Sequence, residues 1–530
     1  MITKSKSNLF LFCAGILLLL SVFLHLYKLG EIPSGFFCDE SSIGYNAWAM
    51  ALTGADEYGN KYPLFFRCFD NYHEPVMVYS IVPIIKLFGL SEFTVRLPSA
   101  LFHIIASISF YFLALRYCRN RYIALAGAFV FSVLPWIFPV SRVMMAGYTA
   151  MLLGICIGWL FMMRAFGEKS YTWAILSAAG WAFAMYSHNC GRPVTAVILT
   201  VFTLCFYRML LKRWKIYTVF ASSFFIFMAP MIIAVMRNPR ILGGRFSQIA
   251  VWNNSSGIWE TLQRIISNYC GYFSSTFLFL SGDGNLRHNS GFGGELYIFL
   301  FPLLLAGFVV LYTQLKKNPW YAFILIGIFT YPVAAIFTID PIHATRSING
   351  APFWTILCLL GADWLFQSRR ILRSILIIIS VLAAIEVSFY MTHYFTRYRE
   401  ISENAFSAPF ITTLKYAFER MNKDDSIYIS PTFFPHAVDR SFKPVWYSHF
   451  LFFGRVSPAD YQKKGLPLRI VPYGGVVSSP GYLVRSSHVA DDYGALYPNF
   501  EKVPSGTKCS GRIKYKKNIY YEIYRIGGTE

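Results

Sequence analysis

Long runs of apolar residues alternate with short polar segments as far as residue 391. Each run has about 20 residues, the length that an α-helix needs to cross a hydrocarbon layer about 30 Å thick. The first run is too long for a signal-peptide core and has no small-residue cleavage site after it, so we expect a retained helix. The pattern predicts about eleven membrane-spanning helices. Their ranges are approximately 9–27, 95–115, 122–140, 147–166, 171–188, 193–211, 216–236, 295–314, 319–338, 347–367 and 371–391.

Basic residues in the short loops predict the orientation of these helices. Cytoplasmic loops of membrane proteins carry an excess of Lys and Arg. With the N-terminus in the cytoplasm, the opposite face carries a loop at 28–94, a loop at 237–294 and the tail from 395. All short loops with clustered basic residues then fall on the inner side: Arg116/Arg119/Arg121, Arg164/Lys169, Arg208/Lys212/Arg213/Lys215, Lys316/Lys317 and Arg369/Arg370/Arg373.

The outer segments differ from one another in pattern. The 28–94 loop contains two amphipathic or interrupted apolar stretches, which are typical of helices lying in the membrane interface. The tail has a helical stretch followed by short β-prone runs between Pro and Gly turns. We therefore expect a transmembrane module over 1–394 and a soluble extracytoplasmic α/β domain over 395–530.

Composition agrees with a polytopic membrane protein and argues against nucleic acid as a partner. The chain is 55% hydrophobic and 14% charged, whereas a soluble domain carries about 25% charged residues. The net charge of +21 is scattered through short loops, which fits topology signals and anionic lipid headgroups rather than nucleic acid. The ten cysteines form no CxxC pair and no zinc spacing. Cys38 and Cys68 both fall on the outer face, and whether they form a disulfide stays open.

Polar residues with catalytic potential gather on the predicted outer face. Each alone has a structural explanation, since an acidic pair can cap a helix and an Arg at a helix end can reach the headgroups. Together they fit the displacement of a phosphate leaving group, in which a carboxylate accepts the proton of an incoming hydroxyl and cations stabilise the phosphate. The acidic members of this set are Asp39 and Glu40. The basic members are Arg142, His188, Arg192, Arg245, His288, His343 and Arg346.

One stretch carries a family resemblance. The residues CDESSIGYNAWAMALTGADEYGNKYPLFF, NYHEPVMVY and LFGLSEFTVRLPSAL, within 38–101, resemble the first extracytoplasmic loop of bacterial GT-C glycosyltransferases of family 39. This family is related to protein O-mannosyltransferases and to the aminoarabinose transferase of lipid A. SRVMMAGY, YSHNCGRP, GDGNLRH and HATRS are similar to its outer-face motifs.

The resemblance implies a multi-pass transferase of the inner (plasma) membrane with its active site outside the cytoplasm. Such an enzyme moves a sugar, with inversion, from a polyprenyl-phosphate donor to a glycolipid, polysaccharide or protein acceptor. Asp39 matches the family's catalytic acidic residue, as general base or as the group that orients the acceptor, and Glu40 matches its neighbour. The seven basic residues above are expected near the donor phosphate.

The chain departs from the family at two places. Relatives often have a phosphate-binding lysine in a KPP segment, where this chain has His73 and Glu74. This pair could hold a divalent cation, so that transfer would be metal-assisted rather than Arg/His-assisted, or the two could pair with each other. Many relatives also have an acid soon after the arginine of SR, where this chain has Ala146 and Gly147. The second acid is thus unassigned, with Asp70 and Glu74 as alternatives.

Two other functions compete with the transferase. A transporter or flippase of lipid-linked glycans would place ionisable residues near the bilayer midplane and have repeated halves. Here the charges cluster at one surface and no repeat is evident. A catalytically inactive relative that acts in envelope assembly also stays open, because the second acid is missing.

Overall fold

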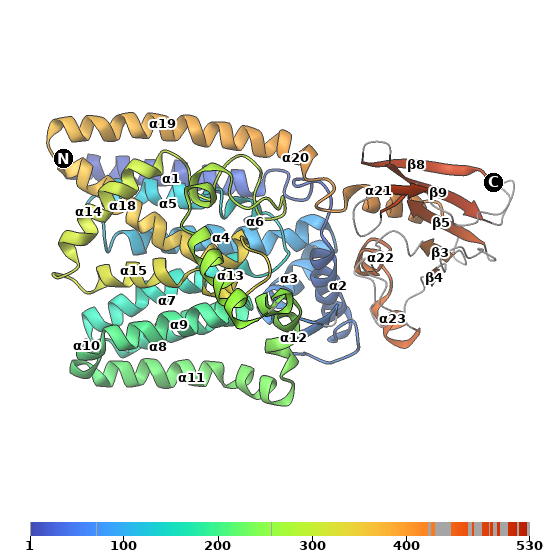
Figure 1. Ribbon diagram of the computed structural model, residues 1–530, viewed down its shortest axis with the longest axis horizontal. Coiled ribbons are helices and arrows are strands. Elements are labelled where there is room, and N and C mark those ends of the chain that lie inside the picture. The colour runs from blue at the N-terminus through green and yellow to red at the C-terminus, as the bar shows by residue number, and fades with distance from the viewer. Residues whose placement is uncertain are drawn as a thin grey trace. The chain divides into compact units, whose positions relative to one another are not determined.

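The computed structural model describes residues 2–69, 71–255, 257–421, 426–429, 447–464, 469–470, 480–486, 488–490, 496–498, 507–516 and 519–526. Helices make up most of the described chain (Figure 1). By contacts between residues, the chain divides into two compact units. The first comprises Met1–Gly30, Glu74–Ser80 and Arg96–Arg399, and the second comprises Glu31–His73, Ile81–Val95 and Glu400–Glu530. The predicted outer loop 28–94 is thus divided, and most of it groups with the tail.

Helices of the first unit follow the predicted apolar runs. In the described residues, five are long and apolar enough to cross a membrane: Asn8–Leu26, Glu92–Ala114, Tyr148–Glu168, Trp214–Arg237 and Arg370–Ile401. Most of the other predicted runs form shorter apolar helices. The helices are α1 (Ile2–Leu26), α4 (Glu92–Ala114), α5 (Arg121–Ser132), α6 (Phe138–Ser141), α7 (Tyr148–Glu168), α8 (Tyr171–Ser187), α9 (Gly191–Cys205), α10 (Tyr207–Lys212), α11 (Trp214–Arg237), α14 (Leu300–Gln314), α15 (Trp320–Thr330), α16 (Val333–Ile336), α18 (Ala351–Gln367) and α19 (Arg370–Phe395).

Prolines explain two differences from the predicted runs. The run 122–140 is split between α5 and α6 at a segment that contains Pro135, and the run 319–338 is split between α15 and α16 before Val333, at Pro332. Proline has no backbone N–H and clashes with the preceding turn, so it favours such breaks. The run 193–211 is also split, between α9 and α10 at Phe206.

Small residues allow the helices of this unit to pack closely. α8 contacts α7, α9 and α11, and these helices run side by side (Figure 1). A Cβ atom added to Gly180 of α8 would lie 2.6 Å from the backbone nitrogen of Gly158 in α7, and one at Gly154 would lie 2.7 Å from the nitrogen of Ala184. Only glycine permits this approach, which is the usual device for close helix packing in membranes.

The second unit joins the first loop to the tail. From the loop come α2 (Cys38–Thr53), the hairpin β1–β2 (Phe66–Cys68 and Asn71–His73) and the end of α3 (Pro75–Phe88). The tail adds α20 (Arg397–Ile401, at the boundary of the units), α21 (Ala408–Phe418), α22 (Tyr447–Phe453) and α23 (Pro458–Lys464).

A five-stranded sheet in the tail has the order β4-β3-β5-β9-β8. β3 runs parallel to β4 and β5, while β9 is antiparallel to β5 and β8. Phe410 and Leu414 of α21 pack on Val484 and Ile523 of the sheet, because alternate strand residues face the same side. The predicted mixture of helix and strand in the tail is therefore present. The strands are β3 (Ser426–Ile429), β4 (Arg469–Ile470), β5 (Gly481–Ser486), β8 (Cys509–Lys516) and β9 (Ile519–Ile526), with a separate pair β6 (His488–Ala490) and β7 (Leu496–Pro498).

Candidate active site

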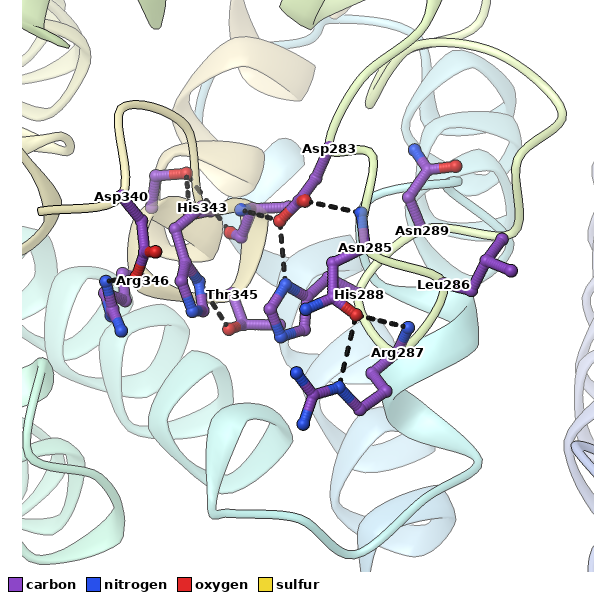
Figure 2. A network of polar contacts seen from close by, with 12 residues as sticks. Asp283, Asn285, Leu286, Arg287, His288, Asn289, Asp340, His343, Thr345 and Arg346 are labelled. Atoms are coloured by element: carbon purple, nitrogen blue, oxygen red, sulfur yellow. Dashed lines mark hydrogen bonds and ion pairs between the residues drawn. The ribbon is translucent and has the colours of Figure 1, made fainter. Parts of the chain in front are cut away.

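Two loops of the first unit meet at Asp283. One follows the short helix Thr276–Leu280, and the other precedes α17 (Ala344–Ser347). Oδ2 of Asp283 lies 2.7 Å from Nδ1 of His288 and accepts a hydrogen bond of 2.8 Å from the backbone N–H of Ala344 (Figure 2). Asp283 therefore ties the two loops together. The ring centroids of His288 and His343 lie 4.2 Å apart as a result.

Turn chemistry shapes the first of these loops. Gly282 has a φ of +65°, and a Cβ there would lie 2.5 Å from the side-chain nitrogen of Asn289. The side chain of Asp283 accepts from the N–H of Asn285, and that of Asn285 accepts from the N–H of Arg287. Such turns are typical of Asp and Asn two residues before the donor. The segment is thus folded largely by its own side chains.

The second loop carries His343 and Arg346. The backbone N–H of His343 donates to the hydroxyl of Tyr272, and Nδ1 of its ring lies 3.1 Å from Oγ1 of Thr345. Nη1 of Arg346 contacts Oδ2 of Asp340 at 2.7 Å. Burial lowers the pKa of His343 strongly, and the positive charge of neighbours that include Arg346 lowers it further. His343 is therefore neutral at physiological pH.

Burial and hydrogen bonding oppose each other at Asp283. Burial alone would raise the pKa of this carboxyl, but the hydrogen bond and charge of His288, with two backbone N–H donors, lower it below its ordinary value. Asp283 is therefore ionised at neutral pH.

A second group of polar side chains in the same unit contains Arg192, Glu74 and His188. Nη2 of Arg192 lies 3.3 Å from Oε1 of Glu74, and both side chains are buried. Burial raises the pKa of Glu74, and the charge of Arg192 opposes part of that rise. His188, also buried, packs on Tyr148 with 4.5 Å between ring centroids.

Cys190 connects these two groups electrostatically. Burial raises the pKa of its thiol to about 12, while the charges of Arg346 and Arg192 both act to lower it. Five of the predicted basic residues gather in this part of the first unit: His188, Arg192, His288, His343 and Arg346.

Arg142, which was also predicted near the donor phosphate, contacts backbone carbonyls elsewhere in the first unit. Its Nη1 donates to the carbonyls of Leu24 and His25, and its Nη2 donates to that of Tyr27, at 2.6–2.7 Å. These carbonyls belong to the end of α1, where helices leave C=O groups without helical partners. Arg142 is fully buried in this capping role. Arg245 falls on α12 (Arg240–Ile249), but its side chain lies outside the described residues.

The predicted acids lie in the second unit, in the first turn of α2. Glu40 is fully buried, and its Oε2 accepts a hydrogen bond of 2.9 Å from the backbone N–H of Phe37, which caps the helix. The side chain of Asp39 is partly exposed. The positive end of the helix dipole favours a carboxylate at this position. The two neighbouring acids thus have different surroundings.

Tail residues hold α2 in place, a feature that the sequence did not predict. Oγ of Ser41 lies 2.6 Å from Nδ1 of His449 in α22, and Ser448 donates to the carbonyl of Cys38. The hydroxyl of Tyr447 donates to Oε1 of the buried Glu57 at 2.6 Å. These partners are separated by 390 to 410 residues. No local pattern could have indicated these contacts.

The pair predicted as metal ligands has other partners. Nε2 of His73 lies 3.3 Å from Oγ of Ser42, while Glu74 faces Arg192. Cys38 and Cys68 are not joined by a disulfide, and Sγ of Cys68 lies 2.7 Å from Oγ of Ser42. Asp70, one alternative for the second acid, lies outside the described residues. No described contact supports a metal between His73 and Glu74.

Another group of side chains could hold a metal. Within the described part of the chain, the group with three convergent His, Cys, Asp or Glu ligands is Asp283, His288 and His343. The ligand atoms of these three side chains all lie within 4.8 Å of one another.

The chain is similar to a known protein family and to several solved structures. The family model described as dolichyl-phosphate-mannose-protein mannosyltransferase matches residues 72–233. No curated protein sequence matches the chain. ArnT from Cupriavidus metallidurans bound to undecaprenyl phosphate is 14% identical, with a TM-score of 0.54 and 98% of both chains covered. The same protein in its apo state is 13% identical, with a TM-score of 0.55, covering 99% of this chain and 98% of that one.

A second solved protein has the same fold. The archaeal oligosaccharyltransferase AglB from Archaeoglobus fulgidus, in complex with an inhibitory peptide and a dolichol-phosphate, is 11% identical with a TM-score of 0.50. The match covers 94% of this chain and 75% of AglB. The protein therefore has the GT-C glycosyltransferase fold and resembles the family 39 enzymes, as the motif in its first loop predicted.

Proposed function

We propose that this protein is a membrane glycosyltransferase that moves a sugar from a polyprenyl-phosphate donor to an extracytoplasmic acceptor, with inversion. The fold and the family model support sugar transfer. A lipid-phosphate donor is supported by the undecaprenyl phosphate of the ArnT structure and the dolichol-phosphate of the AglB structure. The observation that carries the proposal is the gathering of Arg192, Arg346 and three histidines in one part of a GT-C fold.

The guanidinium groups of Arg192 and Arg346 suit the charge that develops in the reaction. The acceptor oxygen forms a bond to the anomeric carbon while the bond from that carbon to the phosphate oxygen breaks. The departing phosphate then carries close to two negative charges instead of one. Guanidinium groups fixed beside it stabilise the transition state more than the bound donor, and this difference accelerates the reaction.

Asp39 is the proposed general base. The hydroxyl proton of the acceptor passes to its carboxylate, a step that typically contributes roughly 10²–10⁴-fold to the rate. Its partial exposure leaves it accessible to an acceptor, whereas the buried Glu40 is engaged in capping α2. Glu40 is therefore a positioning residue. Attack from the face opposite the phosphate gives the inverted product.

Release of polyprenyl phosphate from a panel of polyprenyl-phosphate sugars tests the proposal. Purified wild type should release it with at least one donor when an acceptor extract is present. Asp39→Asn should lower the rate by roughly 10²–10⁴-fold without changing the thermal midpoint. Glu92→Gln is the matched control, because Glu92 is also an acid of the outer loop but forms a partly exposed pair with Lys415. Equal rates for Asp39→Asn and wild type would remove the base assignment, and no release by wild type with any donor would favour the transporter or inactive-relative alternatives.

A further inference from the structure

We propose that the junction between α10 and α11 binds the headgroup of an anionic glycerophospholipid in the inner leaflet of the membrane. α10 ends at Lys212 and α11 begins at Trp214. Both helices belong to the first unit, and they meet at one end of its helices (Figure 1). The charge pattern of the loops assigns this junction to the cytoplasmic side. The inference concerns a lipid other than the proposed sugar donor, and it stands whether or not the proposed sugar transfer is correct.

Acidic residues do not neutralise the cations at this junction. The chain contains no Asp or Glu between Glu168 and Glu260. Within the described residues, no carboxylate forms an ion pair with any of the four cations in the segment 208–215. These cations are Arg208, Lys212, Arg213 and Lys215. The junction therefore concentrates positive charge that has no acidic partner on the protein.

Several arginines of the other predicted inner loops are engaged by the protein itself. Nη2 of Arg116 lies 3.2 Å from Oε1 of Glu168, and Nη1 of Arg119 donates to Oε1 of Gln367. Arg373 donates to two backbone carbonyls. Charge without a protein partner thus distinguishes the segment 208–215 from these positions.

The start of α11 adds donors for a phosphate. α11 has 24 residues, and no side chain caps its N-terminus. The first N–H groups of a helix have no partners within the helix, and together with the helix dipole they favour an anion. The first turn of α11 contains no acidic residue that would take this place. Lys215 lies in that turn, so an ammonium group and backbone N–H groups are available in the same short segment.

Aromatic and apolar side chains beside the cations suit the rest of a lipid. Tyr207 and Trp214 are 50% and 59% exposed, and Leu204 and Leu211 are both 69% exposed. Nζ of Lys215 lies 5.8 Å from the centre of the Trp214 ring. Tyr and Trp are enriched where a membrane meets water, and exposed leucines can contact acyl chains. The segment therefore offers cations for a headgroup next to apolar surface for the chains.

Charge selects the class of lipid. A phosphatidylglycerol headgroup carries one net negative charge, whereas a phosphatidylcholine headgroup is neutral overall. One Lys or Arg near an anionic lipid surface is worth about fivefold in affinity. The four cations of the junction therefore favour phosphatidylglycerol over phosphatidylcholine.

Lipid binding to the full-length protein in a neutral detergent tests the site, with native mass spectrometry as the measurement. Wild type should bind phosphatidylglycerol more tightly than phosphatidylcholine. The triple variant Arg208→Gln/Lys212→Gln/Lys215→Gln should lose about 100-fold in affinity for phosphatidylglycerol, because each cation contributes about fivefold.

The matched control removes three exposed cations from other predicted inner loops. Lys316→Gln/Lys317→Gln/Arg370→Gln should bind phosphatidylglycerol much as wild type does. An equal loss in this variant would show that only the overall charge matters, and it would overturn the inference. Equal affinity of wild type for the two lipids would overturn it too. So would displacement of phosphatidylglycerol by an excess of inorganic phosphate, which would indicate a site for free phosphate.

Wild type alone keeps the test decisive if the triple variant fails to fold. A photoreactive phosphatidylglycerol should label the segment 204–215, and labelling of other segments only would contradict the inference. The measurement needs no sugar donor. A protein that binds phosphatidylglycerol at this junction but transfers no sugar would therefore contradict the proposed function and leave the lipid site intact.

Discussion

The two units of the chain hold their functional side chains in different ways. In the first unit, cations are positioned by ion pairs, such as Arg192 with Glu74 and Arg346 with Asp340. In the second unit, α2 and its acid Asp39 are held mostly by neutral hydrogen bonds from the tail, such as Ser41 with His449. Ion pairs thus position the arginines that we propose to bind phosphate, and hydrogen bonds hold the helix that carries the proposed base. Substitutions in the two units should therefore have different consequences.

The buried pair of Arg192 and Glu74 should give the largest effect on stability. Arg192→Gln leaves a buried carboxylate without its partner and should lower the free energy of unfolding by roughly 3–5 kcal/mol. The double variant Arg192→Gln/Glu74→Gln should recover most of that loss, yet donor turnover should stay low, because the cation is still missing. Unfolding in detergent and release of polyprenyl phosphate separate the two effects. Full activity in the double variant would show that Arg192 does not bind the donor phosphate.

Arg142 offers a contrast inside the same unit. Arg142→Leu removes three hydrogen bonds to the end of α1 and should cost about 3 kcal/mol of unfolding free energy. The KM for the donor should not change in the protein that folds, because this guanidinium is engaged by carbonyls. Arg264→Leu, at a partly exposed pair with Glu260, should be nearly neutral. A stable Arg142→Leu protein with a raised KM for the donor would indicate that Arg142 does bind the donor phosphate.

His449 gives the second unit a pH dependence of its own. Burial lowers the pKa of His449 from its ordinary 6.5 to about 3. As pH falls below 6.5 the unfolded chain binds a proton that the folded chain does not, so the free energy of unfolding decreases. Between pH 7.5 and 5.5 the loss should be roughly 1 kcal/mol. Thermal midpoints at the two pH values should therefore differ less in His449→Gln than in wild type, and equal differences would contradict this account.

Sequence patterns predicted the membrane helices because a bilayer fixes their length and polarity. The hydropathy pattern did not predict the helix breaks near Pro135 and Pro332, although a proline within an apolar run is itself a signal for a break. Loop charge predicted His188, Arg192 and Arg346 on one face, and all three lie in the first unit of the structure.

Other parts of the site could not be predicted. The carbonyl partners of Arg142 were not predicted, because an arginine at a helix end can bind carbonyl oxygens as well as phosphate oxygens. His73 and Glu74 are neighbours in the chain, but they have separate partners in Ser42 and Arg192. The contact of Tyr447 with Glu57 joins residues 390 apart, which no local periodicity can reveal.

The affinity of the purified protein for undecaprenyl phosphate tests the central claim most directly, namely that cations of the first unit bind the donor phosphate. Arg346→Gln should weaken this binding about 10–100-fold, the worth of one charge-assisted hydrogen bond. His449→Gln and Arg264→Gln should bind the lipid as wild type does. Equal affinity in Arg346→Gln and wild type, or an equal loss in His449→Gln, would contradict the assignment of phosphate binding to the first unit.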